Sequence, residues 1–340
     1  MFRTGIIEGF YGEPFTWEQR AALLPFLAQH GFTFYLYAPK AEAHLRRLWR
    51  EPFPEPAAAE LDRFAAAARS HGIAFGVGLS PLDLHASWDD AGRDQLLRRV
   101  EELGRFDWLA LLFDDMVGDI PGLANTQGAI LREVRAATST KLLMCPSYYT
   151  SAGVLDRIFG QRPERYLEDL GAALDPDVDV FWTGPKVCST EYPDEHLQMV
   201  ATQLGRKPFL WDNYPVNDGP KMCKKLHLRP FTGRGPAVRE HTAGLAVNPM
   251  NEVWLNRLVL ATLNRCLDGR PSDALDELLP ADLAAMLRSD IEQFQDSGLD
   301  ELDVQPILQR YAGFEHPAAS EIRGWLRGEY TVGPECLTDV

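Results

Sequence analysis

The amino-acid sequence predicts an α/β protein built as a TIM (β/α)8 barrel with a C-terminal helical extension. Its 340 residues exceed a typical single domain but suit one such barrel with a modest addition. Short apolar runs alternate with longer amphipathic stretches, a pattern typical of β-α-β units and a parallel sheet. Eight strand candidates occur in this alternation, and the GxGxxG turn that is common in doubly wound sheets is absent.

The predicted strands are nearly continuous apolar runs, as expected for strands that are buried on both faces. They cover residues 4–9, 32–37, 74–79, 108–113, 141–145, 178–182, 208–211 and 242–247. The predicted helices have the length and amphipathic pattern of barrel helices. They cover residues 17–29, 57–70, 93–103, 129–137, 153–170, 194–204 and 252–267.

The chain is expected to divide into a catalytic barrel at 1–268 and a helical extension at 269–340. Helical patterns in the extension cover 274–279, 281–294, 307–312 and 318–327. Residues 213–240 are rich in Pro, Gly and basic residues and have no clear helical period, so they predict a long loop over the barrel mouth. The basic residues in 217–235 fit either an anionic partner or a solvated loop.

The overall charge argues against nucleic acid as a partner. The formal net charge is −15, from 49 acidic and 34 basic residues, whereas sequence-independent binding to nucleic acid needs clustered Lys and Arg. The five cysteines are odd in number, widely spaced and without a CxxC pair, so we expect reduced thiols in a cytoplasmic chain. The N-terminus has no signal-peptide pattern, and no apolar run is long enough for a membrane span.

Polar and aromatic residues follow the predicted strands, where the chemistry of a TIM barrel is found. Aromatic rings suit stacking on a sugar ring, while Asn, Asp and Lys suit binding to its hydroxyls. The residues at these strand ends are Glu8 to Gly12, Tyr37 to Lys40, Asp114 and Asp115, Pro146 to Tyr149, Trp182 to Pro185, Trp211 to Asp218, and Asn248 to Met250.

The Asp114-Asp115 pair is the sharpest feature of this rim. Neighbouring residues in a strand point to opposite faces, so both can reach one ligand only where the strand breaks into a loop. Two close carboxylates do not easily both ionise, and an acid beside a carboxylate suits glycoside hydrolysis. A helix cap or surface turn and a divalent-metal site are the alternatives. No cluster of His or Glu accompanies the pair, so we expect no metal and no cofactor.

The other rim residues are ambiguous when taken singly. Lys40 fits a solvated loop, Trp182 and Trp211 fit a core, and Asn248 beside a proline fits an ordinary turn. Glu8 lies so deep in an apolar strand that a structural, hydrogen-bonded carboxylate is expected there. Their shared position on one rim favours a binding site.

Seven sequence motifs follow one another along the predicted barrel: IIEGFYGEPFTW, LYAPK, LLFDDM, CPSYY, FWTGPKV, LWDNYPVND and AVNPM. With these motifs in this order, the chain resembles glycoside hydrolase family 84 over roughly residues 3–255. This family contains O-GlcNAcases and bacterial β-N-acetylglucosaminidases once called hyaluronidases. The family often has acidic residues directly after the lysine, where this chain has Ala41-Glu42, and commonly Trp where it has Phe15. These departures bear on substrate preference.

The resemblance implies a retaining exo-β-N-acetylglucosaminidase that uses the acetamido group of the substrate as nucleophile, through an oxazoline intermediate. Asp114 would hold the acetamido N–H, Asp115 would be the general acid and base, and Tyr149 would bond the acetamido oxygen. The remaining implied or expected substrate-binding residues are Gly9, Phe10, Tyr11, Lys40, Trp182, Trp211, Asn213, Asp218 and Asn248, with Trp211 lining the acetyl pocket.

Two other functions remain open alongside this one. A catalytically silent barrel that binds N-acetylglucosamine would show inhibitor binding without turnover, and a metal-dependent lyase or aldolase would lose activity on chelation. The expected partner is a β-N-acetylglucosaminyl glycoside or glycoprotein. The natural substrate, the oligomeric state and the role of the extension stay open at this stage.

Overall fold

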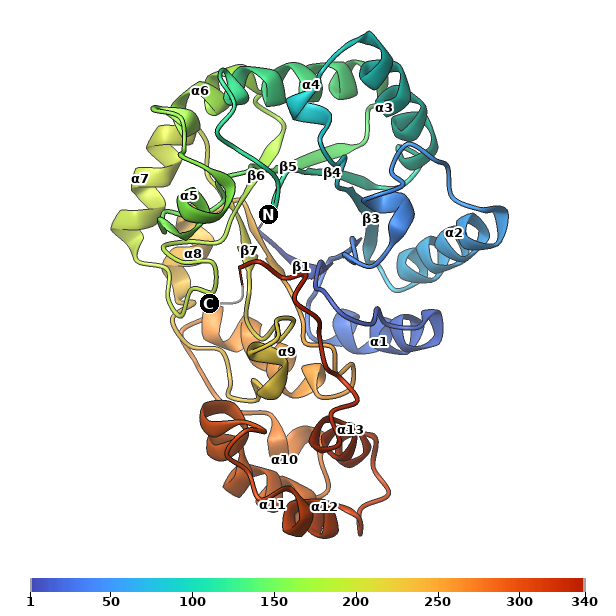
Figure 1. Cartoon of the computed structure of the whole chain (residues 1–340). Helices are drawn as coiled ribbons and strands as arrows, with labels where there is room; N and C mark the ends of the chain where they lie inside the picture. The colour runs from blue at the N-terminus through green and yellow to red at the C-terminus, as the bar shows by residue number, and fades with distance from the viewer. Residues whose placement is uncertain (1, 339–340) are drawn as a thin grey trace.

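The computed structural model describes residues 2–338 and contains the predicted barrel (Figure 1). Eight parallel strands close in sequence order, each pairing with the next and β8 pairing with β1. They are β1 (Arg3–Glu8), β2 (Phe34–Tyr37), β3 (Ala74–Leu79), β4 (Trp108–Leu112), β5 (Lys141–Cys145), β6 (Asp179–Trp182), β7 (Phe209–Asp212) and β8 (Gly244–Val247). The fold class predicted from the sequence is confirmed.

Aromatic rings close the N-terminal end of the barrel. Phe34 stacks on Trp108 with 4.5 Å between ring centroids, and Phe209 meets Phe34 edge-on at 5.7 Å. Glycines make room for them: a Cβ on Gly5 would lie 2.4 Å from the Phe34 ring, and one on Gly244 would lie 2.5 Å from that of Phe209. Because this end is filled, a ligand has access only from the opposite end.

Helices surround the barrel, mostly at the predicted positions. They are α1 (Trp17–Gln29), α2 (Glu55–Ser70), α3 (Asp90–Leu103), α4 (Leu123–Ala137), α5 (Val154–Phe159), α6 (Tyr166–Ala173), α7 (Asp194–Leu204), α8 (Pro236–His241) and α9 (Asn256–Leu267), with short 3₁₀ turns at Ala43–Leu45, Leu84–Ala86 and Met222–Lys224. Two predictions were wrong. The helix predicted at 153–170 is broken, because Gly160 has a φ of 92° and Pro163 follows. The loop at 213–240 contains α8.

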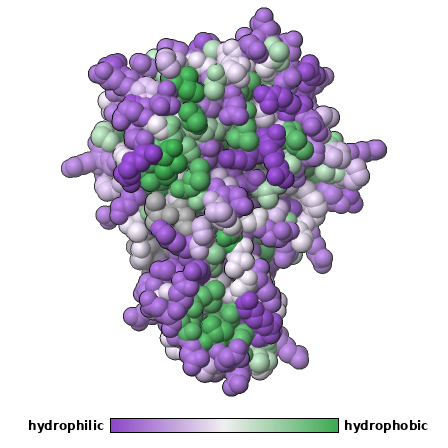
Figure 2. Space-filling view, in the orientation of Figure 1, coloured by the Kyte–Doolittle hydropathy of each residue, from purple (hydrophilic) through white to green (hydrophobic). Residues whose placement is uncertain are grey.

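The helical extension forms a narrower lobe below the barrel (Figure 1), and on the face shown in Figure 2 hydrophilic side chains surround hydrophobic patches on both parts. It consists of α10 (Leu275–Leu278), α11 (Ala281–Glu292), a π-helical turn (Gln293–Ser297), α12 (Val304–Tyr311) and α13 (Pro317–Leu326). Its apolar core also includes Leu226 and Leu228 from the loop between β7 and β8. The extension therefore supports a loop that borders the barrel mouth. The division at residue 268 stays a prediction.

Most basic residues of the loop at 217–235 are paired with protein groups. Arg229 donates to Asp296 at 2.6 Å, and Lys224 donates to Asp300 at 2.8 Å, both across to the extension. Arg234 is buried and forms a two-point ion pair with Asp212 at 2.7 and 2.8 Å. These charges tie the loop to its neighbours, which weakens the hypothesis of an anionic partner.

The sequence also led to predictions about membrane spans and disulfide bonds. Among residues 2–338, no helix is both long and apolar enough to span a bilayer. Within the same residues no disulfide bond is present.

Glu8 is the structural carboxylate that the sequence predicted. Its side chain is 0% exposed, and it accepts hydrogen bonds from Arg20 at 2.6 and 2.7 Å, from Tyr35 at 2.5 Å and from the Phe15 amide at 3.2 Å. These contacts link β1 to α1 and β2. The carboxylate therefore faces away from the pocket described below.

We expect Glu8→Gln to lower the free energy of unfolding by about 3–5 kcal/mol, because it leaves the Arg20 guanidinium buried without a counter-charge. Urea denaturation measures the change. Glu60→Gln, which removes the partner of the exposed Arg63, is the control and should change stability little. A small loss for Glu8→Gln would show that the buried pair adds no stability.

Candidate active site

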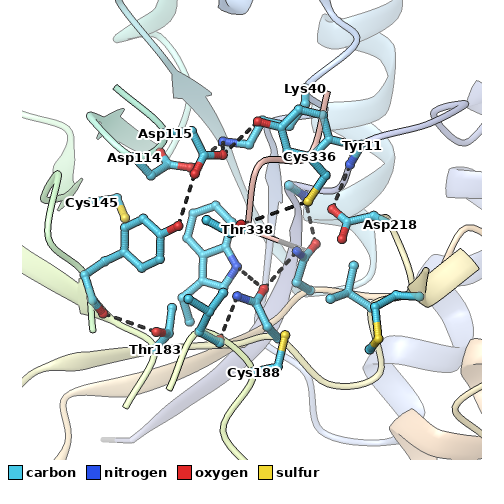
Figure 3. Close-up of a pocket in the computed structure, with 18 residues that line it drawn as sticks. Tyr11, Lys40, Asp114, Asp115, Cys145, Thr183, Cys188, Asp218, Cys336 and Thr338 are labelled. Carbon is cyan, nitrogen blue, oxygen red and sulfur yellow. Dashed lines mark hydrogen bonds and ion pairs between the residues drawn. The ribbon is translucent and has the colours of Figure 1, made fainter. Parts of the chain in front are cut away.

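A pocket opens at the C-terminal ends of the strands, where the sequence placed the site (Figure 3). Ten of the twelve predicted site residues line it: Gly9, Tyr11, Lys40, Asp114, Asp115, Tyr149, Trp211, Asn213, Asp218 and Asn248. Trp211 lies in β7, and the other nine come from the segments that follow six different strands. The barrel thus brings together residues that are up to 239 positions apart in sequence.

Asp114 and Asp115 both face this pocket because the chain turns sharply after β4. Asp115 has a φ of 57°, in the left-handed region that is strained for most residues and tolerated by Asp. Both carboxylates are buried. The strand break that two adjacent aspartates need is therefore present.

Each carboxylate has a different set of partners. Asp115 accepts hydrogen bonds from the Tyr11 hydroxyl at 2.8 Å and the Tyr149 hydroxyl at 3.1 Å, one on each oxygen. Asp114 Oδ2 accepts from Lys40 Nζ. Asp114 Oδ1 is buried and has no hydrogen-bond partner among the described residues. A buried acceptor without a donor suits a ligand N–H or O–H.

Lys40 lies between the two carboxylates, with Nζ 3.6 Å from Asp115 Oδ2. Burial raises the pKa of Asp115, but the charges of Lys40 and Arg46 and the hydrogen bonds from Tyr11 and Tyr149 lower it below its usual value overall. The expectation that one of two close carboxylates resists ionisation therefore does not hold for Asp115, whose pKa is lowered. The sequence argument considered only repulsion between two carboxylates and not the cation beside them.

We expect Lys40→Met to move the basic limb of the pH profile of kcat/KM upward by about one pH unit or more, because an opposite charge at this range lowers a carboxyl pKa by about 1–3. The removed charge favours the carboxylate, so without it Asp115 stays protonated to higher pH. Lys207→Met, on the exposed surface, should leave the limb in place. An unmoved limb in Lys40→Met would mean that Asp115 does not control it.

A chain of amides lines the floor of the pocket. Asn248 accepts from the Gly9 amide at 3.2 Å and donates to Asn213 at 3.1 Å, and Asn213 Oδ1 also accepts from Trp211 Nε1 at 2.9 Å. A Cβ on Gly9 would lie 2.5 Å from the Trp211 ring, so only glycine permits this approach. The chain fixes the orientation of both asparagines.

Asp218 lines the pocket beside the turn that follows β1. Its Oδ2 accepts from the Tyr11 amide at 2.9 Å. Burial raises the pKa of Asp218 to about 6, with the charge of Asp115 adding to the effect and the amide hydrogen bond opposing it. It presents a second buried carboxyl to a polar ligand.

Two predicted residues lie outside the pocket. The Phe10 side chain packs in a small apolar cluster with Phe15, Val216 and Val253, and only its carbonyl, which accepts from the Lys40 amide, supports the site. Trp182 is fully buried, and its Nε1 donates to His196 at 3.0 Å. Their place at strand ends did not reveal which way their side chains turn.

The pocket also contains residues that the sequence did not predict: Cys145, Thr183, Val187, Cys188, Val216, Met222, Cys336 and Thr338. Cys145 and Thr183 lie in motifs at the strand ends, so their position was a usable signal. Cys336 and Thr338 follow α13, and no local pattern placed them near the barrel.

The residues from 2 to 338 contain no group of three or more His, Cys, Asp or Glu side chains that could hold a metal ion. The expectation of a site without metal or cofactor stays a prediction.

A family model described as beta-N-acetylglucosaminidase matches residues 4–289, which is most of the chain. The chain belongs to the β-N-acetylglucosaminidase family. This confirms the resemblance seen in the ordered motifs. Because the match runs from β1 into α11, family membership covers the whole barrel and all twelve predicted site residues.

Relatives of this β-N-acetylglucosaminidase family member include the proteins called Protein O-GlcNAcase in Mus musculus and Rattus norvegicus. Each is 33% identical over 275 residues, which is 77% of this chain and 29% of the relative. The chain thus spans less than a third of their length. A mutant of the Thermobaculum terrenum O-GlcNAc hydrolase is a structural neighbour, with a TM-score of 0.80, 28% identity, and coverage of 97% of this chain and 81% of that chain.

Proposed function

We propose that the protein is a retaining exo-β-N-acetylglucosaminidase that hydrolyses terminal β-linked N-acetylglucosamine, as an O-GlcNAcase does, by substrate-assisted catalysis. The observation that carries the proposal is Asp114 Oδ1, a buried acceptor without a donor among the described residues, in a pocket that also holds Asp115 and Tyr149. An acetamido N–H supplies the missing donor. Family membership and the names of the relatives support the same activity.

In the first step the acetamido oxygen attacks C1 of the sugar and the bond from C1 to the leaving oxygen breaks. Asp114 accepts the acetamido N–H and so stabilises the positive charge that develops on the oxazoline. Asp115 gives its proton to the leaving oxygen. When substrate binds, the Tyr149 hydroxyl turns its single proton from Asp115 to the acetamido oxygen and keeps this oxygen directed at C1.

In the second step water attacks C1 from the face that the leaving group vacated. Asp115, now ionised, takes the proton from this water, and the bond from C1 to the acetamido oxygen breaks. The sugar keeps its β configuration because both steps invert C1. The contacts with Lys40, Tyr11 and Tyr149 that lower the Asp115 pKa favour this base form.

The rest of the pocket holds the sugar. Lys40, Asp218, Asn213, Asn248 and the backbone at Gly9 supply polar groups for its hydroxyls, and Trp211 forms the wall of the acetyl pocket. The closed floor admits one terminal sugar, so the enzyme acts from the chain end. Sugars borne on proteins are the proposed substrates, by analogy with the relatives.

Hydrolysis of 4-nitrophenyl β-N-acetylglucosaminide at neutral pH tests the proposal, with the β-glucoside as the matched control. Cleavage of the acetamido sugar alone is expected, because glucose has no group that can attack C1. Comparable cleavage of both substrates would contradict the mechanism. Binding of a thiazoline inhibitor without any turnover would instead establish the silent binding barrel, and loss of activity with EDTA would indicate a metal-dependent reaction.

A further inference from the structure

Residues 331–338, here called the strap, return from the helical extension to the barrel. In Figure 1 the strap runs from the end of α13 back to the barrel and crosses its open end. Cys336 and Thr338 are buried and line the pocket together with Asp115 and Asp218. Leu337 between them is 57% exposed, so the strap presents alternate side chains to the pocket and to solvent.

The strap touches both sides of the pocket mouth. Near its start, Val332 packs over the turn after β1, where a Cβ on Gly12 would lie 3.0 Å from the Val332 side chain. Near its end, the Thr338 side chain hydrogen-bonds Tyr149, whose hydroxyl also donates to Asp115. Cys336 lies between these points, with the Thr338 hydroxyl 4.0 Å from its sulfur.

Cys336 is placed near the carboxylates as a neutral group. Burial raises the pKa of its thiol to about 12, and the charges of Asp218 and Asp115 add to the increase. A thiol that stays protonated is a poor nucleophile. Cys336 therefore places a neutral side chain beside Asp115 and Asp218.

The strap takes up part of the pocket, because Cys336 and Thr338 line it together with Asp115 and Tyr149. Among the described residues, no backbone–backbone hydrogen bond joins the strap to the barrel. A segment held by a few side-chain contacts opens at low cost compared with a helix or strand.

From these observations we propose that the mouth of the pocket binds a polypeptide segment and that the strap is its resident occupant, which substrate must displace. The occupant is a peptide that places a threonine hydroxyl beside Tyr149. The inference rests on the proposed function for the identity of the substrate. That the strap occupies the mouth of the pocket rests on the geometry alone. The strap then acts as an intramolecular competitive inhibitor. Substrate binds only to molecules whose strap has left the pocket, so the apparent affinity for substrate falls in proportion to the fraction of such molecules, while kcat is unchanged.

A matched pair of variants tests the proposal in the full chain. Cys336→Asp adds a carboxylate that faces Asp218 and Asp115 and should expel the strap by charge repulsion. Leu337→Asp adds the same charge one residue away, on the exposed side. For 4-nitrophenyl β-N-acetylglucosaminide we expect Cys336→Asp to lower KM more than threefold with kcat within twofold of the parent. Leu337→Asp should change neither value.

A smaller fall in KM for Cys336→Asp, or an equal fall in both variants, would overturn the proposal. Calorimetric titration with N-acetylglucosamine gives a readout that needs no turnover and should show the same ratio of affinities. If no variant hydrolyses the aryl substrate, the proposed function fails, while this ratio of affinities still decides the proposal for the strap. A synthetic peptide of sequence TVGPECLT should inhibit Cys336→Asp competitively, and inhibition no stronger than by a scrambled peptide would also overturn it.

Discussion

Asp115→Ala is expected to slow hydrolysis of N-acetylglucosamine linked to a peptide serine or threonine by about 10²- to 10⁴-fold, the usual contribution of a general acid. The release of 4-nitrophenol from the aryl substrate in the first step should slow much less, because a good leaving group departs without a proton. Asp115 is buried in the pocket, where the hydroxyls of Tyr11 and Tyr149 donate to its two oxygens. The measurement is kcat/KM for a glycopeptide and for aryl substrates of graded leaving-group pKa.

Two further variants separate chemistry from folding in this experiment. Asp115→Asn keeps a residue that tolerates the left-handed backbone at this position and should show the same dependence on leaving group. Asp119→Ala removes an exposed aspartate of the same loop that does not line the pocket and should leave both rates unchanged. An equal loss on aryl and peptide substrates in Asp115→Asn would rule out the role as general acid.

Asp114→Ala is expected to reduce kcat/KM by about 10²- to 10³-fold for every substrate, whatever its leaving group, which is the effect of removing one electrostatic contact to a developing charge. In the proposed mechanism Asp114 acts on the acetamido group and not on the leaving oxygen, so a better leaving group would not compensate for its loss. The same aryl series measures it. Rates that recover with the best leaving groups would assign Asp114, and not Asp115, to proton transfer.

Different effects are expected for the two aspartate variants, although the two residues are adjacent in the sequence. Their difference depends on geometry that one backbone angle creates, because the left-handed conformation at Asp115 lets both side chains reach one ligand. Asp115 then has phenols on both oxygens, whereas Asp114 has Lys40 on one oxygen and no described partner on the other. Plotted against leaving-group pKa, the rates of the two variants should therefore have clearly different slopes.

Alternating hydrophobic runs were enough to predict the barrel, because a strand buried on both faces must be apolar along its length. The strand at 141–145 and the helices at 17–29 and 194–204 have the predicted bounds. The same reasoning located the rim, since all parallel strands of a barrel end on one side. Ordered motifs at these ends identified the family before any contact was known.

Side-chain direction and partners beyond the motif required the folded chain. Trp182 and Trp211 both occur at strand ends, yet Trp182 turns outward to His196 and Trp211 turns into the pocket. The lowered pKa of Asp115 depends on Lys40, which comes from a loop 74 positions before its neighbour Asp114. Electrostatic effects depend on distance in space, and local periodicity contains no information on that distance.

The sequence alone indicated where Asp114 and Asp115 would lie and to which family the chain belongs, because strand periodicity and motif order are local properties. The pairing of the basic loop with the extension and the return of Cys336 and Thr338 to the pocket were not visible in that pattern. Both depend on how α10–α13 pack against the barrel. Packing of this kind is set by many long-range contacts at once, and no segment of the sequence specifies it alone.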